Sequence, residues 1–323
     1  MSLRIVFMGT PDCARPSMEG LLERGHSLMV VCQPDRQRGR GRRVGQPPVK
    51  LCCDAHGLPL IQPHSVNTEE AHSLIAEFDP DLYCVVAFGQ ILKPDTLSIP
   101  RLGAINLHFS LLPRWRGAAP VEYAIWHGDA VTGVSTQFMV QALDAGDVIF
   151  QAEEPIRPTD TAGDLMERLS ALGAEVLAET VRLIELGEAR AEPQDPAGVT
   201  LAPRIKPEEG EIDWHADADS IARHIRAFNP RPGCHTQWAD TSVKLWRAWP
   251  QDGEGEPGEV LAIEGDTLVL AAGQGAVVLA EVQPEGRARQ TGRDFANGRH
   301  LAPGHRLPAP HRSELRPAAR QES

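Results

Sequence analysis

No hydrophobic run in this sequence is long. Charged residues, proline or glycine interrupt every apolar stretch before it reaches the roughly eighteen residues that a membrane-spanning helix needs. The N-terminus from Met1 to Arg4 also lacks the basic leader, extended apolar segment and small-residue cleavage site of a secreted protein. We therefore expect a cytoplasmic protein without a membrane segment.

The cysteines are scattered along the chain. The sequence lacks the short paired spacings of a zinc site or of a disulfide-rich secreted domain, although it has six cysteines: Cys13, Cys32, Cys52, Cys53, Cys84 and Cys234. The histidines show no ligand-like spacing with cysteine or with each other. We predict free, buried thiols and no bound metal.

Two motifs of common enzyme classes are missing as well. Gly9-Thr10-Pro11 follows the first apolar run, but the G-x-G-x-x-G fingerprint of dinucleotide-binding proteins is absent. A G-x-S-x-G motif, which presents a nucleophilic serine in many hydrolases, is absent too. The sequence therefore argues against a dinucleotide cofactor and against a covalent intermediate on such a serine.

The chain has no overall excess of basic residues. Its formal net charge of -12 argues against a protein that coats nucleic acid non-specifically. Arginine is nevertheless concentrated in two segments. The segment 287–320 contains eight arginines, and five of the eight residues in 36–43 are arginine: Arg36, Arg38, Arg40, Arg42 and Arg43. Such clusters are typical of a local contact with a polyanion, although a charge run is more often a solvated loop.

The length and hydrophobic pattern predict two domains. A chain of 323 residues exceeds the usual size of one domain. In the first half, apolar runs at 3–9, 28–33, 60–61, 82–88 and 104–108 alternate with helical patterns at 17–24, 49–56 and 69–78. Apolar strands separated by helices predict an α/β domain with a doubly wound, mostly parallel, Rossmann-like sheet. A long amphipathic helix over 161–187 would close it.

The second half reads differently. Prolines between 188 and 210 predict a linker. A helical pattern at 217–228 comes next. Five short β-like runs then follow, at 234–238, 243–249, 258–263, 267–270 and 276–282. Five short strands fit a small β-barrel of the OB type. We thus predict a catalytic domain over 1–188, a linker over 189–209, an OB-like domain over 210–300 and a mobile tail over 301–323.

The densest set of polar residues lies at the end of a predicted strand. Asn106 and His108 are two positions apart, so both side chains would point to one face. Asp144 begins an acidic turn, Asp144 to Asp147, before another predicted strand. An amide, an imidazole and a carboxylate suit acyl transfer, because they can stabilise an oxyanion and move a proton. Taken singly, each of these residues more often has a structural role, as a hydrogen-bonding residue of a strand or as part of a turn.

A longer motif makes the functional interpretation specific. The run from Asn106 to Pro120, NLHFSLLPRWRGAAP, resembles the signature of the folate-dependent formyltransferases, in particular those that act on charged tRNA. The resemblance extends over 33–36 with 39–41, and over 143–147, 205–214, 225–230 and 232–233. Two positions depart from the family pattern. Phe109 stands where the family often has a small residue, and Val140 stands where an acidic or polar residue is frequent.

The resemblance implies a role for each motif. Asn106, His108 and Asp144 fall on the catalytic positions, and the positions that hold the folate are Ser110, Leu111, Leu112 and Pro113. The arginine run at 36–43 falls on a loop that engages the acceptor end of a tRNA. The expected reaction transfers the formyl group of 10-formyltetrahydrofolate to the α-amine of initiator methionyl-tRNA, for translation initiation, by a monomeric enzyme.

Other members of the same chemical class remain alternatives. Formyltransferases acting on glycinamide ribonucleotide or on an amino sugar, and a formyl-folate hydrolase, would share the Asn-His-Asp set. A small substrate requires neither an arginine-rich insertion nor an OB-like module, whose usual ligand is an oligonucleotide or oligosaccharide. A tRNA-binding protein without catalytic activity is the alternative from a different class, and the intact set of Asn106, His108 and Asp144 argues against it.

Overall fold

The computed structural model describes residues 2–38, 43–239 and 241–307. The chain divides into two compact units. The N-terminal unit comprises Met1–Gly117, Val131–Pro155 and Met166–Leu201, and the C-terminal unit comprises Ala118–Ala130, Ile156–Leu165 and the chain from Ala202. By this division, two short segments of the predicted catalytic domain, Ala118–Ala130 and Ile156–Leu165, group with the C-terminal unit.

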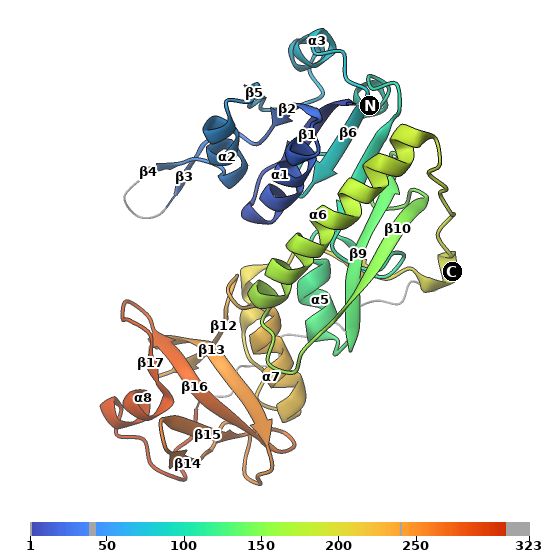
Figure 1. Ribbon diagram of the computed structural model, residues 1–323. Coiled ribbons are helices and arrows are strands. Elements are labelled where there is room, and N and C mark those ends of the chain that lie inside the picture. Colours follow the sequence, from blue (N-terminus) through green and yellow to red (C-terminus); the bar gives the residue numbers. More distant parts are fainter. Residues whose placement is uncertain (1, 39–42, 240, 308–323) are drawn as a thin grey trace. The chain divides into compact units, whose positions relative to one another are not determined.

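The N-terminal unit is built on a seven-stranded sheet of order β10-β9-β7-β6-β1-β2-β5 (Figure 1). Its strands are β1 (Arg4–Gly9), β2 (Ser27–Val31), β5 (Leu60–Ile61), β6 (Leu82–Val86), β7 (Ala104–His108), β9 (Val131–Phe138) and β10 (Val148–Pro155). The first five form parallel ladders, while β9 and β10 are antiparallel to their neighbours. The predicted mostly parallel α/β sheet is confirmed. Strand β9 was not predicted, because polar residues interrupt its apolar pattern.

Helices cover both faces of this sheet, namely α1 (Arg15–Glu23), α2 (Pro48–His56), α3 (Glu69–Glu77), α4 (Pro94–Leu97) and α6 (Ala162–Leu186). On one face α6 packs directly on β7, where a Cβ on Gly173 would lie 2.7 Å from Leu107 Cδ2. On the other face the core includes Ala104 of β7 and Ile75 of α3. Because side chains alternate along a strand, Asn106 and His108 point away from α6.

The segment predicted as an arginine-rich loop is partly a β-hairpin. Strands β3 (Arg36–Arg38) and β4 (Arg43–Gly45) pair antiparallel, with Arg38 opposite Arg43. Residues 39–42 between them lie outside the described residues. A shorter pairing joins β8 (Arg116–Gly117) to β11 (Leu201–Ala202).

The C-terminal unit contains an antiparallel sheet of order β12-β13-β16-β15-β14, with β17 on β16. The strands are β12 (Cys234–Trp238), β13 (Thr241–Gln251), β14 (Val260–Glu264), β15 (Thr267–Ala271), β16 (Ala276–Pro284) and β17 (Gln290–Thr291), with helices α5 (Pro120–Trp126), α7 (Ala218–Ala227) and α8 (Gly292–Gly298). The five predicted strands are present. Helix α5 packs against α7 within this unit.

Residues 301–307, predicted from the sequence to belong to a mobile tail, bond to the C-terminal unit. Leu307 N donates to Gly258 O, Val260 N donates to His305 O, and both Leu301 and Leu307 are buried. These backbone bonds and two buried leucines make 301–307 part of the C-terminal unit. The bonded residues are more than forty positions apart, so local composition could not reveal the pairing. Residues 308–323 lie outside the described residues.

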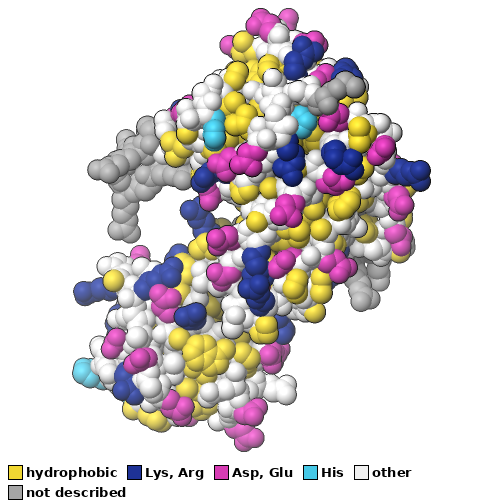
Figure 2. Space-filling view, in the orientation of Figure 1, with side chains coloured by type: hydrophobic (Ala, Val, Ile, Leu, Met, Phe, Trp, Pro, Cys, Tyr) yellow, Lys and Arg dark blue, Asp and Glu magenta, His cyan; other side chains and the backbone are white. Residues whose placement is uncertain are grey.

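No helix within the described ranges combines the length and the apolar character needed to cross a membrane. None of the six cysteines forms a disulfide, as predicted, and all of them except Cys13 are buried. On the face shown in Figure 2, basic and acidic side chains are interspersed over both units.

A buried histidine in the C-terminal unit gives a pH-dependent prediction. His224 of α7 stacks on Trp126 and meets the edge of Phe228, with ring centroids 4.8 Å and 4.5 Å away. Its Nε2 has no hydrogen-bond partner among the described residues. Burial lowers the pKa of His224 from 6.5 to about 4, and a backbone hydrogen bond at Glu209 opposes this shift only in part.

Folding therefore excludes a proton that the unfolded chain binds. We expect His224 to lower the free energy of unfolding by about 1.4 kcal/mol for each unit that the pH falls from 6.5 to 4. The reason is that only the unfolded state takes up the extra proton in that range. Denaturant unfolding at several pH values measures this slope. His224→Phe should remove it, and the same replacement at the exposed His64 should not. An unchanged slope in His224→Phe would contradict the assignment.

Candidate active site

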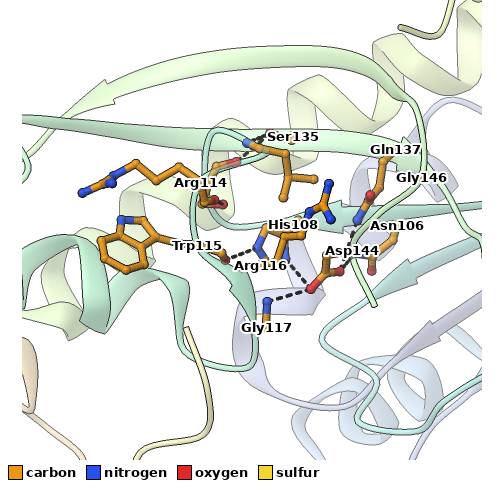
Figure 3. Close-up of polar contacts among 12 residues, drawn as sticks. Asn106, His108, Arg114, Trp115, Arg116, Gly117, Ser135, Gln137, Asp144 and Gly146 are labelled. Atoms are coloured by element: carbon orange, nitrogen blue, oxygen red, sulfur yellow. Dashed lines mark hydrogen bonds and ion pairs between the residues drawn. The ribbon is translucent and has the colours of Figure 1, made fainter. Parts of the chain in front are cut away.

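Asp144 is the centre of a polar cluster in the N-terminal unit (Figure 3). It lies between β9 and β10, and its side chain is only 9% exposed. Oδ1 accepts hydrogen bonds from Asn106 Nδ2 at 3.4 Å and from Gln137 Nε2 at 3.1 Å. Oδ2 accepts one from the Gly117 amide at 2.9 Å and lies 3.6 Å from His108 Nδ1. Every group that faces this carboxylate is a donor or can become one.

His108 is held between two oxygens. Its Nε2 lies 2.8 Å from the carbonyl oxygen of Trp115, and its Nδ1 faces Asp144. A carbonyl only accepts hydrogen bonds, so Nε2 carries a hydrogen in this arrangement. A hydrogen on Nδ1 would face the Asp144 carboxylate. A substrate atom that reaches Nε2 must compete with the Trp115 carbonyl.

The backbone of the acidic turn depends on a glycine. A Cβ on Gly146 would lie 1.7 Å from the carbonyl oxygen of Phe138, so no other residue fits without displacing the chain. Asp144 itself has a φ of 49°, a left-handed conformation that aspartate tolerates better than most residues. The Asp-Ala-Gly-Asp sequence therefore forms a tight turn that aims the Asp144 carboxylate at the end of β7.

The segment predicted to hold folate forms a turn next to this cluster. The Ser135 hydroxyl donates to Ser110 O at 2.6 Å and accepts from Leu112 N at 3.0 Å. The Ser110 hydroxyl is fully buried and donates to Arg114 O at 2.6 Å, so it stabilises the turn itself. Leu112 is buried, which leaves Leu111 and Pro113 as the partly exposed apolar side chains of the segment.

The structure describes the predicted tRNA-binding arginines only in part. Arg36 is exposed, and its Nη2 donates to Gln33 Oε1 at 3.1 Å. Arg38 and Arg43 are described for the backbone alone, and Arg40 and Arg42 lie outside the described residues. The structure thus brings Asn106, His108 and Asp144 together but does not place the arginine cluster against them.

Several residues of the cluster were not predicted from the sequence. Gln137 pairs with Asn106 across β9 and β7, which only the sheet register reveals. Gln151 donates to Leu112 O at 2.9 Å and to the Ser135 hydroxyl at 2.7 Å. Gln194, from the predicted linker, donates to the carbonyls of Asp144 and Gly146. Their only signal in the sequence was polar character within segments that carry no recognisable motif.

Burial distinguishes three other sequence positions. Trp115 is 4% exposed, with the Arg114 guanidinium 4.2 Å from its ring centroid, which favours a structural role over stacking on a ligand. Phe109 is buried and Val140 is exposed.

One group in the described part of the chain has metal-ligand character. Glu19, Cys52 and His56 offer ligand atoms within 4.8 Å of one another, outside the Asp144 cluster. Arg15 forms an ion pair with Glu19 at 3.7 Å, so a cation already neutralises that carboxylate.

Two family models match most of the chain. A formyl transferase model matches residues 3–181, and a model of the formyl transferase C-terminal domain matches residues 204–300. Methionyl-tRNA formyltransferase from Symbiobacterium thermophilum is 44% identical over 98% of each chain. The enzyme of that name from Citrifermentans bemidjiense is 44% identical over 91% of this chain and 92% of its own.

Solved structures share the fold at lower identity. HypX from Aquifex aeolicus in complex with tetrahydrofolic acid has a TM-score of 0.64 at 19% identity, over 92% of this chain and 47% of its own. An N-formyltransferase from Helicobacter canadensis, in complex with folinic acid and dTDP-3-aminofucose, has a TM-score of 0.65 at 16% identity. The match covers 86% of this chain and 99% of that chain. The two family models and the near full-length relatives together show that this chain is an enzyme of the methionyl-tRNA formyltransferase family.

Proposed function

We propose that Asn106, His108 and Asp144 catalyse transfer of the formyl group of 10-formyltetrahydrofolate to the α-amine of initiator methionyl-tRNA. The observation that carries the proposal is that an amide and an imidazole each lie within 3.6 Å of one carboxylate in a chain of this family. The product primes translation initiation.

Each of the three residues has a separate role in the proposed reaction. The amine of methionine attacks the formyl carbon, a C–N bond forms, the bond from that carbon to N10 of the carrier breaks, and the amine proton passes to N10. Asn106 donates one amide hydrogen to Asp144 and keeps the other for the oxyanion. His108 stabilises the developing negative charge and moves the proton, and Asp144 orients the imidazole.

The folate carrier fits the segment beside the cluster. When bound, it supplies the formyl carbon. Leu111 and Pro113 are partly exposed within five residues of His108 and offer apolar surface to a flat ring. The fold neighbours crystallised with tetrahydrofolic acid and with folinic acid support this ligand class. Ser110 and Leu112 would act by holding the turn, since both are buried.

Charged tRNA is favoured over a small amine as the acceptor. The relatives at 44% identity are named for methionyl-tRNA, whereas the fold neighbour in complex with dTDP-3-aminofucose is only 16% identical. The arginine run adds a local basic segment to a chain of net charge -12, which suits a contact with one part of a polyanion.

A comparison of acceptors tests the proposed function. With 10-formyltetrahydrofolate, we expect rapid formylation of methionyl-tRNA and negligible formylation of free methionine, an amino sugar nucleotide or glycinamide ribonucleotide. The KM for tRNA should rise steeply with salt. Arg40→Ala combined with Arg42→Ala should raise that KM, spare the KM for folate, and flatten the log-log salt dependence by roughly one unit for each phosphate that is no longer neutralised.

A matched pair of tail substitutions controls for net charge in this experiment. Arg316→Ala combined with Arg320→Ala removes the same charge from residues that also lie outside the described ranges. We expect this pair to leave the salt dependence close to that of the wild type. Equal salt slopes for the loop variant and the wild type would mean that the arginine run is only a solvated loop.

A further inference from the structure

A glutamine from the segment predicted to be a linker reaches the turn that carries Asp144. The Nε2 of Gln194 lies 2.8 Å from the carbonyl oxygen of Asp144 and 2.7 Å from that of Gly146. It also lies 3.2 Å from the Oε1 of Gln137, whose own amide donates to the Asp144 carboxylate. One carboxamide therefore contacts both the backbone of the turn and a side chain that bonds its carboxylate.

The other end of the same carboxamide is also engaged. Gln194 Oε1 accepts from Arg116 Nε at 3.0 Å and from Arg116 Nη2 at 2.7 Å. Arg116 is adjacent to Gly117, whose amide donates to Asp144 Oδ2. Gln194 thus bonds to Arg116 and to Gln137, while Gly117 and Gln137 donate to different oxygens of the Asp144 carboxylate. The donor and acceptor atoms of its carboxamide are all used.

The backbone around Gln194 is docked on the same unit. Glu192 and Val148 exchange two backbone hydrogen bonds of 2.9 Å at the start of β10. Thr200 accepts from Trp115 N through its hydroxyl at 2.8 Å and from Arg116 N through its carbonyl at 2.9 Å. The segment from 192 to 200 is therefore fixed at both ends, so the Gln194 side chain is held in place rather than displayed on a free linker.

We infer that Gln194 is a positioning residue for the formyl-transfer reaction, acting by holding the Asp144 turn against Arg116 and Gly117. This inference rests on the proposed role of Asp144. The turn needs such support because Asp144 adopts a left-handed conformation and the chain beside Gly146 is tightly packed against Phe138. Without the carboxamide, two partly buried carbonyls lose their donor and the carboxylate can move away from His108.

Two substitutions of Gln194 test the inference in the full-length enzyme. Gln194→Leu removes all of its hydrogen bonds at similar volume and should lower kcat by about tenfold or more, because small displacements of catalytic groups are costly. The KM values for folate and tRNA should stay nearly unchanged. Gln194→Glu keeps an acceptor for Arg116 but turns a carboxylate towards the two carbonyls, so we expect a kcat at least as low. Gln251→Leu makes the same change at an exposed glutamine and should have no effect.

Combining Gln194→Leu with Asp144→Asn distinguishes positioning from a general loss of structure. If Gln194 acts through Asp144, the double variant should be about as slow as Asp144→Asn alone. If the double variant lost kcat by the product of the two single losses, or if Gln194→Leu kept a normal kcat, the inference would be overturned. If Asp144→Asn itself retained wild-type kcat, the proposed catalytic role of Asp144 would fail instead. Thermal unfolding of each variant checks that the fold is kept.

Discussion

His108→Ala is expected to lower kcat for formyl transfer by about 10²-fold or more while leaving the fold and folate binding intact. The imidazole is held between Trp115 O and the Asp144 carboxylate, where it can pass a proton in the reaction. Single-turnover formylation of methionyl-tRNA measures the chemical step directly. Equilibrium titration with a reduced folate measures binding separately.

Two further variants sharpen this prediction. His108→Gln keeps a side chain that can donate to Trp115 O but cannot carry a positive charge, so we expect it to remain nearly as slow as His108→Ala. His64→Ala removes an exposed histidine elsewhere in the same unit and should keep wild-type kcat. If His108→Ala turned over at a rate close to the wild type, His108 would have no part in the mechanism.

Asp144→Asn is expected to reduce kcat by a similar factor, about 10²-fold, for a different physical reason. Asn106, Gln137 and Gly117 all donate to this carboxylate. An asparagine would offer one oxygen and turn its amide hydrogens towards other donors, so the cluster could not keep its present hydrogen bonds. It would also remove the negative charge that faces His108 Nδ1 at 3.6 Å.

The neighbouring aspartate provides the control for this substitution. Asp147→Asn makes the same chemical change three residues away, on an exposed side chain of the same turn. We expect Asp147→Asn to keep kcat, and Asp144→Asn to lose kcat with an altered dependence of rate on pH. A rate and pH profile identical to the wild type in Asp144→Asn would make its carboxylate a structural part of the turn only.

The local pattern of the sequence determined the elements and the family. Apolar runs and helical spacings predicted β1, β6, β7 and α6 close to their observed bounds, because each pattern reports the burial of one short segment. The run from Asn106 to Pro120 identified the family, since it is a long uninterrupted motif. The spacing of Asn106 and His108 within a predicted strand also placed both side chains on one face, because residues i and i+2 share a face in any strand.

Tertiary structure alone decided which segments meet. Gln137 contacts Asp144 because β9 pairs antiparallel with β7, and that register depends on packing across the sheet. Gln194 lies in a proline-rich stretch that resembles a linker, yet the pairing of Glu192 with Val148 folds it back onto the site. Contacts between residues about fifty positions apart leave no periodic trace in the sequence, because they depend on how whole elements pack rather than on any local preference.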